Sequence, residues 1–183
     1  MAHSNKINFL AKHLVIPNYE LILGEIQSFY LENMPDDNSQ FSHVSPVDLV
    51  GVSPNLKQWL DNNKLVLNKS AIIRTPPPTK NLDPHTDTQY RDLALNFPVK
   101  NCEGCYTALY KMTKGTQNLK VLPNGLTYVT YSNDVEFEEV TRFTLDVPVL
   151  FNTKVPHQVW NPTDKIRISA SLRFMNDPWF LAD

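Results

Sequence analysis

The sequence predicts one mainly β domain of the α+β class, with helices first and a sandwich, jelly roll or barrel of short strands after them. Its 183 residues fit a single domain over 1–183, and no repeat, low-complexity tract or linker divides the chain. Apolar residues recur at helical spacing in a helical support of about 17–64. They alternate in short, β-rich runs in a core of about 65–175, and we expect the helices to pack on one sheet of that core.

Two amphipathic helices are expected in the N-terminal part. In the first, apolar residues recur at offsets of three and four from Ile22 to Tyr30, and Pro35 ends the run. The second begins with Ser53 as N-cap and Pro54 at the first helical position. A serine oxygen can accept a hydrogen bond from an unpaired amide there, and proline has no N–H to leave unpaired.

The β core is predicted from eight short runs that favour extended backbone. They cover residues 65–67, 71–73, 90–95, 106–110, 142–145, 147–151, 158–160 and 167–174. In the last run, polar and apolar residues alternate, so one strand face is polar and cationic and the other is apolar. The polar face carries Arg167, Ser169, Ser171 and Arg173. Loops are expected between the runs, and those most relevant to the mouth of a barrel are 36–45, 75–84 and 111–124.

The composition excludes several classes of protein. The five glycines stand at least ten positions apart, which rules out a Gly-rich dinucleotide fingerprint or phosphate loop. The formal charge of −2 comes with scattered Lys and Arg, so we expect no nucleic acid partner. No apolar run approaches the roughly 18 residues of a spanning helix, and Met1 to Phe9 lack a secretory apolar segment. We therefore expect a cytoplasmic protein without a membrane partner.

The two cysteines, Cys102 and Cys105, form a C-x-x-C pair. This spacing can serve redox chemistry or half of a zinc site. No second Cys pair is present, and the surrounding pattern is strand–turn–strand rather than a helix start. These features favour reduced thiols near a hairpin, as is usual in intracellular chains.

Metal-binding chemistry is suggested by His85 and Asp87, which stand two residues apart. On an extended strand these two side chains project to the same face, where both could reach one metal ion. A surface His beside an Asp is the common alternative for such a triplet. His157 is a candidate third ligand that the fold would have to bring back. Two histidines and one carboxylate form the facial triad that holds non-haem Fe(II) with three open positions.

An anion site is suggested ten residues after His157. Arg167 and Ser169 share the polar face of the last predicted strand. A guanidinium that binds in a bidentate manner, together with a hydroxyl donor, is a good receptor for a carboxylate. Taken without the other motifs, the same pattern also fits an ordinary strand with its polar face in water.

Taken together, His85-x-Asp87, His157 and Arg167-x-Ser169 resemble the signature of the Fe(II)- and 2-oxoglutarate-dependent oxygenases in order and spacing. The resemblance covers roughly residues 70–174. Segments 93–98 and 149–153 resemble an aspartyl/asparaginyl hydroxylase-like branch that includes phage and marine microbial proteins. The resemblance implies a double-stranded β-helix, a cupin-like jelly roll, with the H-x-D on its second core strand, the distal histidine on the seventh and the arginine on the eighth.

The resemblance also implies roles for the residues. His85, Asp87 and His157 would hold Fe(II), while Arg167 and Ser169 would bind the far carboxylate of 2-oxoglutarate, with O2 as the second cosubstrate. The implied activity is hydroxylation of a C–H bond in a peptide side chain or small molecule, with release of succinate and CO2. Arg167 stands where the prolyl hydroxylase branch usually has lysine, so collagen-type proline hydroxylation is not the first expectation.

Four further residues are weaker candidates for the same site. Asn96 and Tyr106 fall on strands expected beside the H-x-D strand and could hydrogen-bond the cosubstrate, although Asn96 could equally start a turn and Tyr106 could be a core residue. Tyr90 and Arg91 follow the metal motif, where family substrates enter, and an exposed pair at a strand edge is the alternative.

Two other functions compete with the oxygenase hypothesis. The first is a non-catalytic jelly-roll module with a binding or structural role. The second is a cupin-type enzyme with another cosubstrate, but such sites cluster three histidines and a glutamate, and no H-x-H occurs in this sequence.

Overall fold

The computed structural model describes residues 9–33, 41–44, 46–77, 79–87, 92–121 and 127–183. Within them the strands form two antiparallel sheets of six strands each. The first sheet has the order β1 (Ala11–His13), β10 (Val149–Asn152), β5 (Leu93–Lys100), β12 (Arg167–Phe174), β3 (Leu67–Thr75), β2 (Phe41–Val44). The second has the order β7 (Gln117–Val121), β8 (Thr127–Tyr131), β4 (Thr79–Asp87), β11 (His157–Asn161), β6 (Tyr106–Lys114), β9 (Glu136–Thr144).

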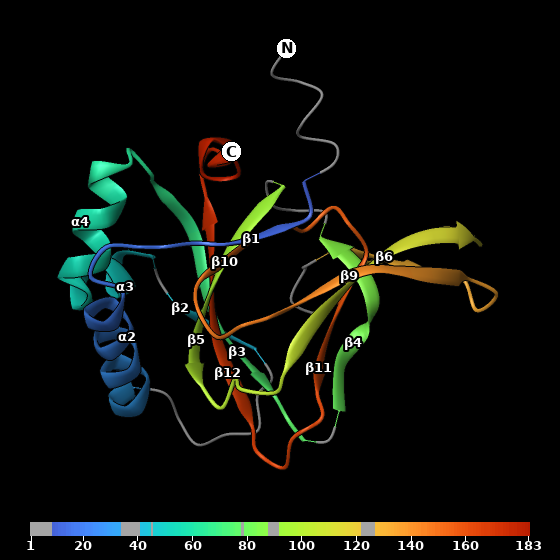
Figure 1. Ribbon diagram of the computed structural model, residues 1–183, viewed down its shortest axis with the longest axis horizontal. Helices are drawn as coiled ribbons and strands as arrows, with labels where there is room; N and C mark the ends of the chain where they lie inside the picture. The colour runs from blue at the N-terminus through green and yellow to red at the C-terminus, as the bar shows by residue number, and fades with distance from the viewer. Residues whose placement is uncertain (1–8, 34–40, 45, 78, 88–91, 122–126) are drawn as a thin grey trace.

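The chain passes from one sheet to the other at most of its connections. Strands β3, β5, β10 and β12 lie in the first sheet, and β4, β6, β9 and β11 lie in the second. Among these eight strands, β6 and β9 are the one consecutive pair that stays in the same sheet. The β7–β8 hairpin lies between them in the sequence. As a result, strands far apart in the sequence lie side by side, such as β4 with β11 and β3 with β12 (Figure 1).

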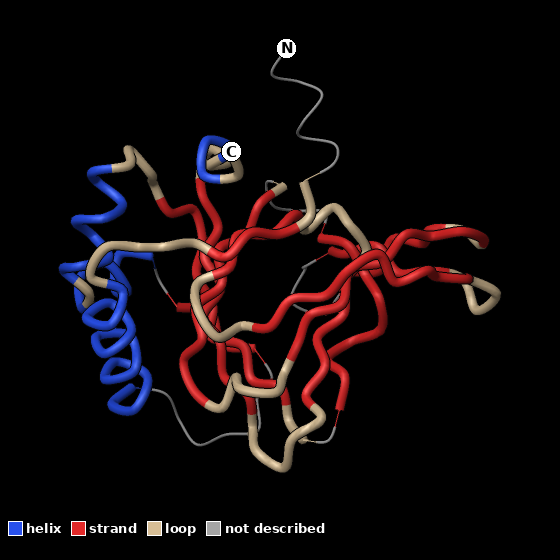
Figure 2. Tube along the Cα trace, viewed as in Figure 1, coloured by secondary structure: helices blue, strands red, loops and turns tan. Residues whose placement is uncertain are grey.

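Three helices lie on one side of the first sheet, on the left of Figures 1 and 2. They are α2 (Tyr19–Asn33), α3 (Pro46–Val52) and α4 (Pro54–Asn62), and a short 3-10 helix, η1 (Trp179–Leu181), follows β12. Ile22 and Ile26 of α2 are fully buried in a core with Leu95 of β5 and Leu172 of β12. Apolar residues of β12 therefore face the helices, and its polar residues face the second sheet.

The cap predicted at Ser53 is present. Ser53 Oγ accepts a hydrogen bond from the Leu56 amide at 3.3 Å and donates one to Glu25 of α2 at 2.5 Å. Glu25 also accepts a hydrogen bond from the side-chain amide of Asn55 at 2.6 Å. The first turn of α4 is thus attached to α2 by polar contacts as well as by the apolar core.

A second, smaller core lies between the two sheets. It joins Val149 and Phe151 of β10 to Leu109 of β6 and Phe143 of β9. These apolar residues occupy only part of the inter-sheet space, and the polar residues of β12, β4 and β11 occupy the rest. The inside of this β structure is therefore apolar on one side and polar on the other.

The strand predictions are corrected in several places. The run 71–73 lies within a longer strand, β3, which the run 65–67 meets only at Leu67, and a strand, β4, occupies most of the expected loop 75–84. The inner face of β4 carries His85 and Asp87 instead of apolar residues, so no alternating pattern announces it. Strand β7 is exposed at every residue, and β6 extends into the expected loop 111–124. In the expected loop 36–45, residues 41–44 form β2, while 34–40 and 45 lie outside the described residues.

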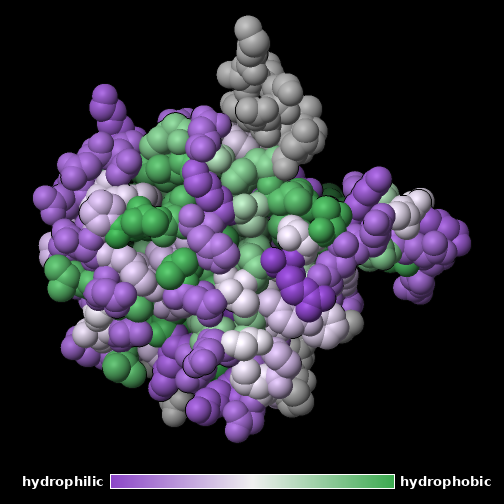
Figure 3. All heavy atoms as spheres, in the orientation of Figure 1, coloured by the Kyte–Doolittle hydropathy of each residue, from purple (hydrophilic) through white to green (hydrophobic). Residues whose placement is uncertain are grey.

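The surface is mixed in polarity. Strands β6 and β9 extend away from the rest of the molecule, on the right of Figure 1, and this extension is largely hydrophilic in Figure 3. None of the helices in the described part of the chain has the length and apolar character needed to cross a membrane.

Candidate metal centre

His85, Asp87 and His157 come together between the two sheets. Each offers one ligand atom, and these atoms all lie within 4.8 Å of one another. His85 and Asp87 project from one face of β4, as expected for residues two apart on a strand. His157 opens the neighbouring strand β11, where its Cα pairs with that of His85. The antiparallel pairing of β4 with β11 thus brings back a residue that is distant in the sequence.

Both histidine rings are oriented by a main-chain carbonyl. The Nδ1 atom of His85 lies 2.9 Å from the carbonyl oxygen of Asp83, and that of His157 lies 2.9 Å from the carbonyl of Val155. A proton on Nδ1 satisfies each carbonyl and leaves the Nε2 lone pair available as a ligand. His85 Nε2 lies 4.0 Å from Asp87 Oδ1. The fold and these hydrogen bonds therefore bring the candidate ligand atoms close to one another.

The ionisation of the group also suits a cation. Burial lowers the pKa of His157 to about 4, so its ring is neutral near pH 7. Burial alone would raise the pKa of Asp87, but Arg173 and the two histidines outweigh it, and the pKa lies below its ordinary value. A neutral imidazole at His157 and an ionised carboxylate at Asp87 are the forms in which these side chains bind a divalent ion.

Asp87 is held from three directions. Its amide donates a hydrogen bond to the carbonyl of Thr153 at 3.1 Å, and its own carbonyl accepts one from Lys154 Nζ at 2.7 Å. Arg173 Nη2 contacts the carboxylate oxygen Oδ2 at 2.5 Å. Arg173 comes from β12 in the opposite sheet, so this ion pair crosses the interior. The sequence analysis placed Arg173 on the polar face of its strand but gave it no role.

The strand irregularity beside the ligands follows from Pro84. The β4–β11 register shifts between His157 and Val159, which pairs with Asn81. Proline has no N–H for a ladder and is accepted in strands at such irregularities. Pro156 immediately precedes the first residue of β11. Each of the two candidate histidines therefore follows a proline: His85 where the pairing is irregular, and His157 where the pairing begins.

Aromatic side chains enclose the histidines. The ring of Phe151 packs edge-on against His157 with centroids 5.3 Å apart, and Tyr128 of β8 packs edge-on against His85 at 5.8 Å. The His85 and His157 rings lie 4.5 Å apart. This packing restricts both rings to few orientations and keeps most water away from them.

Arg167 is a buried cation among neutral partners. It is 1% exposed, and in the described part of the chain no carboxylate pairs with it. Its neighbours are the thiols of Cys102 and Cys105, whose pKa values are raised by burial, so both are uncharged near pH 7. Arg167 Nε has no hydrogen-bond partner among the described residues. A buried guanidinium without an anion is costly, so the arrangement favours an anionic ligand.

Other polar atoms face the same interior. Ser169 is buried two residues from Arg167 on β12, and the buried Oδ1 of Asn96 on β5 has no hydrogen-bond partner in the part of the chain that the structure describes. Within the described part of the chain, the buried hydroxyls of Thr75 and Thr107 also have no hydrogen-bond partner, and Thr75 stands opposite Arg167 in the β3–β12 register. The sequence analysis missed both threonines. The two-residue period of a strand could have found Thr107, because Thr107 lies two residues from the inward-facing Leu109 and so shares its face.

Among the remaining candidates, the structure describes only Tyr106. Tyr106 lies on the outer face of its strand, stacked on Trp160 at 6.2 Å and beneath Arg142 at 4.5 Å, because its neighbour Thr107 takes the inward position. We therefore leave Tyr106 out of the cosubstrate site. Tyr90 and Arg91 lie outside the described residues.

The C-x-x-C pair contains two free, buried thiols. Cys102 Sγ donates to the carbonyl of Ile168 at 3.1 Å, and Cys105 Sγ donates to Asn161 Oδ1 at 3.3 Å. Among the described residues, neither cysteine joins a group of three metal-ligand side chains. The reduced-thiol interpretation fits these contacts, although the thiols lie beside Arg167 and not on a surface hairpin.

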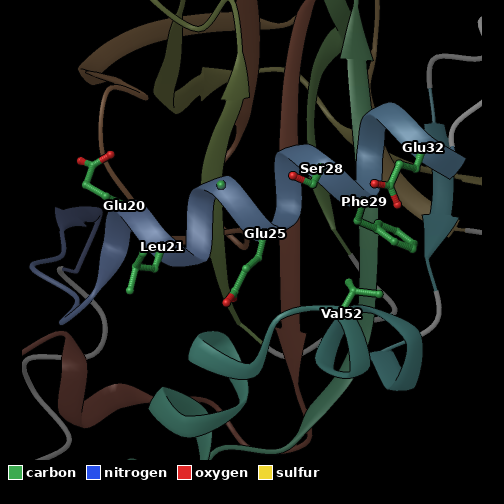
Figure 4. A pocket seen from close by; sticks show the side chains of 8 residues that line it. Glu20, Leu21, Glu25, Ser28, Phe29, Glu32 and Val52 are labelled. Carbon is green, nitrogen blue, oxygen red and sulfur yellow. The ribbon is translucent and has the colours of Figure 1, made fainter.

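A separate groove of about 480 Å³ runs along α2, on the opposite side of the first sheet from the metal-ligand group (Figure 4). It is lined by Glu20, Leu21, Gly24, Glu25, Ser28, Phe29, Glu32 and Val52. In Figure 4 the Glu25 side chain points toward the helices that follow, where it binds Ser53 and Asn55. The groove holds no histidine or arginine and is not part of the candidate centre.

Comparison with known proteins gives likeness in structure and none in sequence. No protein-family model and no curated protein sequence matches the chain. The epimerase SnoN, solved in complex with Fe3+, alpha ketoglutarate and nogalamycin RO, is 11% identical with a TM-score of 0.56, over 96% of this chain and 85% of SnoN. At this identity the likeness shows a shared fold.

Two further solved structures are similar at lower TM-scores. The non-heme alpha ketoglutarate dependent carbocyclase SnoK is 13% identical with a TM-score of 0.49, over 92% of this chain and 80% of SnoK. A prolyl-4-hydroxylase of Pseudomonas putida is 12% identical with a TM-score of 0.46, over 94% of this chain and 96% of that one. Neither protein is described as an aspartyl or asparaginyl hydroxylase, so that branch stays a prediction.

Proposed function

We propose that this chain is an Fe(II)- and 2-oxoglutarate-dependent oxygenase built on a double-stranded β-helix. The observation that carries the proposal is the combination of a largely buried His-Asp-His group with a buried guanidinium that has no anionic partner among the described residues. The strand order supports it, because β3 to β6 and β9 to β12 would be the eight core strands, with ligands on the second and seventh and Arg167 on the eighth.

The residues fit the metal. His85 and His157 would offer Nε2, and Asp87 would offer Oδ1, since its Oδ2 is taken by Arg173. Three protein ligands of this kind leave open positions for other ligands. When bound, iron supplies the chemistry by which O2 oxidises 2-oxoglutarate to succinate and CO2 and a substrate C–H to C–OH.

The residues also fit the cosubstrate. Arg167 would pair with the far carboxylate of 2-oxoglutarate, and the hydroxyl of Ser169 would donate a hydrogen bond to the same carboxylate. The hydroxyls of Thr75 and Thr107, which have no partner among the described residues, could donate hydrogen bonds to oxygen atoms of the same molecule, and Asn96 remains a proposed cosubstrate contact. The aromatic walls of Phe151 and Tyr128 would keep bulk water from the reacting atoms.

The substrate is proposed only as a class, either a peptide side chain or a small molecule. It would enter beside the ligands, near the segment that contains Tyr90 and Arg91, which remain proposed substrate contacts. The aspartyl/asparaginyl hydroxylase-like branch rests on segments 93–98 and 149–153 of the sequence.

The test is binding of the metal and cosubstrate followed by turnover. Anaerobic Fe(II) plus 2-oxoglutarate should give a weak visible charge-transfer band that is lost in Asp87→Ala and Arg167→Ala and kept in Arg142→Ala, a surface control. Aerobic samples should form succinate only with Fe(II), in a screen over amino acids, peptides and small metabolites. Absence of the band together with absence of 2-oxoglutarate binding would contradict the proposal and favour a non-catalytic module.

A further inference from the structure

We propose that Arg173 is a positioning residue that keeps Asp87 a one-oxygen ligand of the metal. The inference rests on the proposed metal site and goes beyond it, because it concerns how the carboxylate is presented. Arg173 Nη2 and Asp87 Oδ2 are 2.5 Å apart, and the two side chains are 12% and 17% exposed. The contact is therefore a largely buried ion pair within the ligand group.

The main chain of Asp87 is already fixed, so the ion pair acts on its side chain. The amide and carbonyl of Asp87 are bound by the Thr153 carbonyl and by Lys154. The remaining freedom is rotation of the carboxylate about its two side-chain bonds. By holding Oδ2, Arg173 selects the rotation that leaves Oδ1 facing His85 Nε2, 4.0 Å away.

The position of Arg173 suits this role. It lies on the inner face of β12 in the first sheet, whereas Asp87 lies on β4 in the second sheet. The contact is reached only when both sheets are in place, so the orientation of the carboxylate depends on the closed β structure. A planar guanidinium also fixes direction better than an ammonium group does.

The consequence concerns the number of open positions on the metal. A carboxylate that binds through both oxygens would occupy one more position than a carboxylate that binds through one. Two histidines and a one-oxygen carboxylate leave three positions. A bidentate cosubstrate and O2 need all three, so an arginine that occupies Oδ2 preserves the position that O2 would take.

The experiment uses Co(II) as a spectroscopic probe in the full-length protein, without 2-oxoglutarate or O2. The dissociation constant and the visible d–d spectrum would be measured for the wild type, Arg173→Gln and Arg173→Lys. Arg142→Gln is the matched control, because Arg142 also pairs with a carboxylate, Glu139 at 2.6 and 2.9 Å, but on the surface. Circular dichroism would show that each variant is folded.

We expect Arg173→Gln to weaken Co(II) binding about tenfold or more and to change the shape of the spectrum, as loss of an outer partner commonly does. Arg173→Lys should restore part of both, and Arg142→Gln should match the wild type. In an Asp87→Asn background, Arg173→Gln should add little, because the residue it acts through is already altered.

Other outcomes overturn the inference. If Arg173→Gln keeps the Co(II) dissociation constant within twofold of the wild type and leaves the spectrum unchanged, then Arg173 is not needed to orient the carboxylate of Asp87. Tighter binding with an unchanged spectrum would show that Arg173 only repels the ion. Binding of 2-oxoglutarate is measured separately. If the wild type binds Co(II) but not 2-oxoglutarate, the proposed function is contradicted, while the comparison of the Arg173 variants can still be interpreted, so the two failures are distinguishable.

Discussion

At the residue scale, His157 changes its ionisation behaviour on folding. Its ring is fully enclosed by Phe151, His85 and the β4–β11 ladder, so the charged form loses its hydration and the pKa falls to about 4. The unfolded chain has the ordinary value near 6.5 and therefore binds a proton first on acidification.

We predict that the metal-free protein loses stability as the pH falls from about 6.5 toward 4. The folded pKa lies below the unfolded one, so the contribution of His157 is complete above 6.5 and is lost below it, by about 3 kcal/mol in total. Urea unfolding with a chelator, at about pH 7.5 and pH 5, measures the difference. His157→Gln should flatten this dependence, and an equal slope in that variant would contradict the prediction.

A second prediction concerns the uncompensated charge of Arg167. Cys102→Asp places a carboxylate beside the guanidinium and should compete with an anionic ligand. We expect binding of 2-oxoglutarate to weaken about tenfold or more, which corresponds to about 1.4 kcal/mol, while Co(II) binding is kept. Isothermal titration calorimetry on the metal-loaded protein measures both. Cys102→Ser is the near-isosteric control, and equal affinity in Cys102→Asp and Cys102→Ser would argue against Arg167 as the anion receptor.

At the element scale, the start of helix α4 and both ends of strand β12 were predicted as they are observed. Ser53 and Pro54 are local signals, because a cap needs only the neighbouring amides. The alternation in β12 is strict because both of its faces are buried and differ in polarity. Strand β4 had no such signal, since its inner face carries the candidate ligands His85 and Asp87, and its pairing with β11 is irregular near Pro84.

The Ser53 cap gives a prediction at this scale. Ser53→Ala removes the bond to the Leu56 amide and leaves Glu25 without its 2.5 Å donor. We expect the free energy of unfolding to fall by about 1–2 kcal/mol, measured by urea denaturation. Ser53→Thr should retain most of the stability, and Co(II) binding should be the same in all three proteins. A loss of metal affinity in Ser53→Ala would show that α4 affects the site, contrary to expectation.

At the scale of the whole molecule, the first sheet separates two environments. Its outer face packs with the helices in an apolar core, and its inner face presents the polar row of β12 to the second sheet. The main apolar core and the candidate site therefore lie on opposite faces of the first sheet.

This separation predicts that a core deletion on the helix side will cost stability without changing the site. Ile26→Ala removes a fully buried side chain of α2 and should lower the free energy of unfolding by about 2–4 kcal/mol. The folded variant should keep the Co(II) spectrum and affinity of the wild type. Leu109→Ala is the comparison from the inter-sheet core, where Leu109 pairs with His157 and the spectrum should change. A changed spectrum in Ile26→Ala would contradict the separation.

The sequence by itself determined the local features: two capped or Pro-bounded helices, the two faces of β12, and the candidate residues His85, Asp87, His157 and Arg167. The helices and the faces of β12 follow from periodicity and from residue chemistry within a few positions, whereas the set of candidate residues was assembled from a resemblance in the order and spacing of motifs. Only the tertiary structure decided that β11 lies beside β4, that Arg173 reaches Asp87 across the sheets, and that Thr107 rather than Tyr106 faces inward. Such contacts join residues that are distant in the sequence, and their geometry depends on how the strands of two sheets are paired and packed.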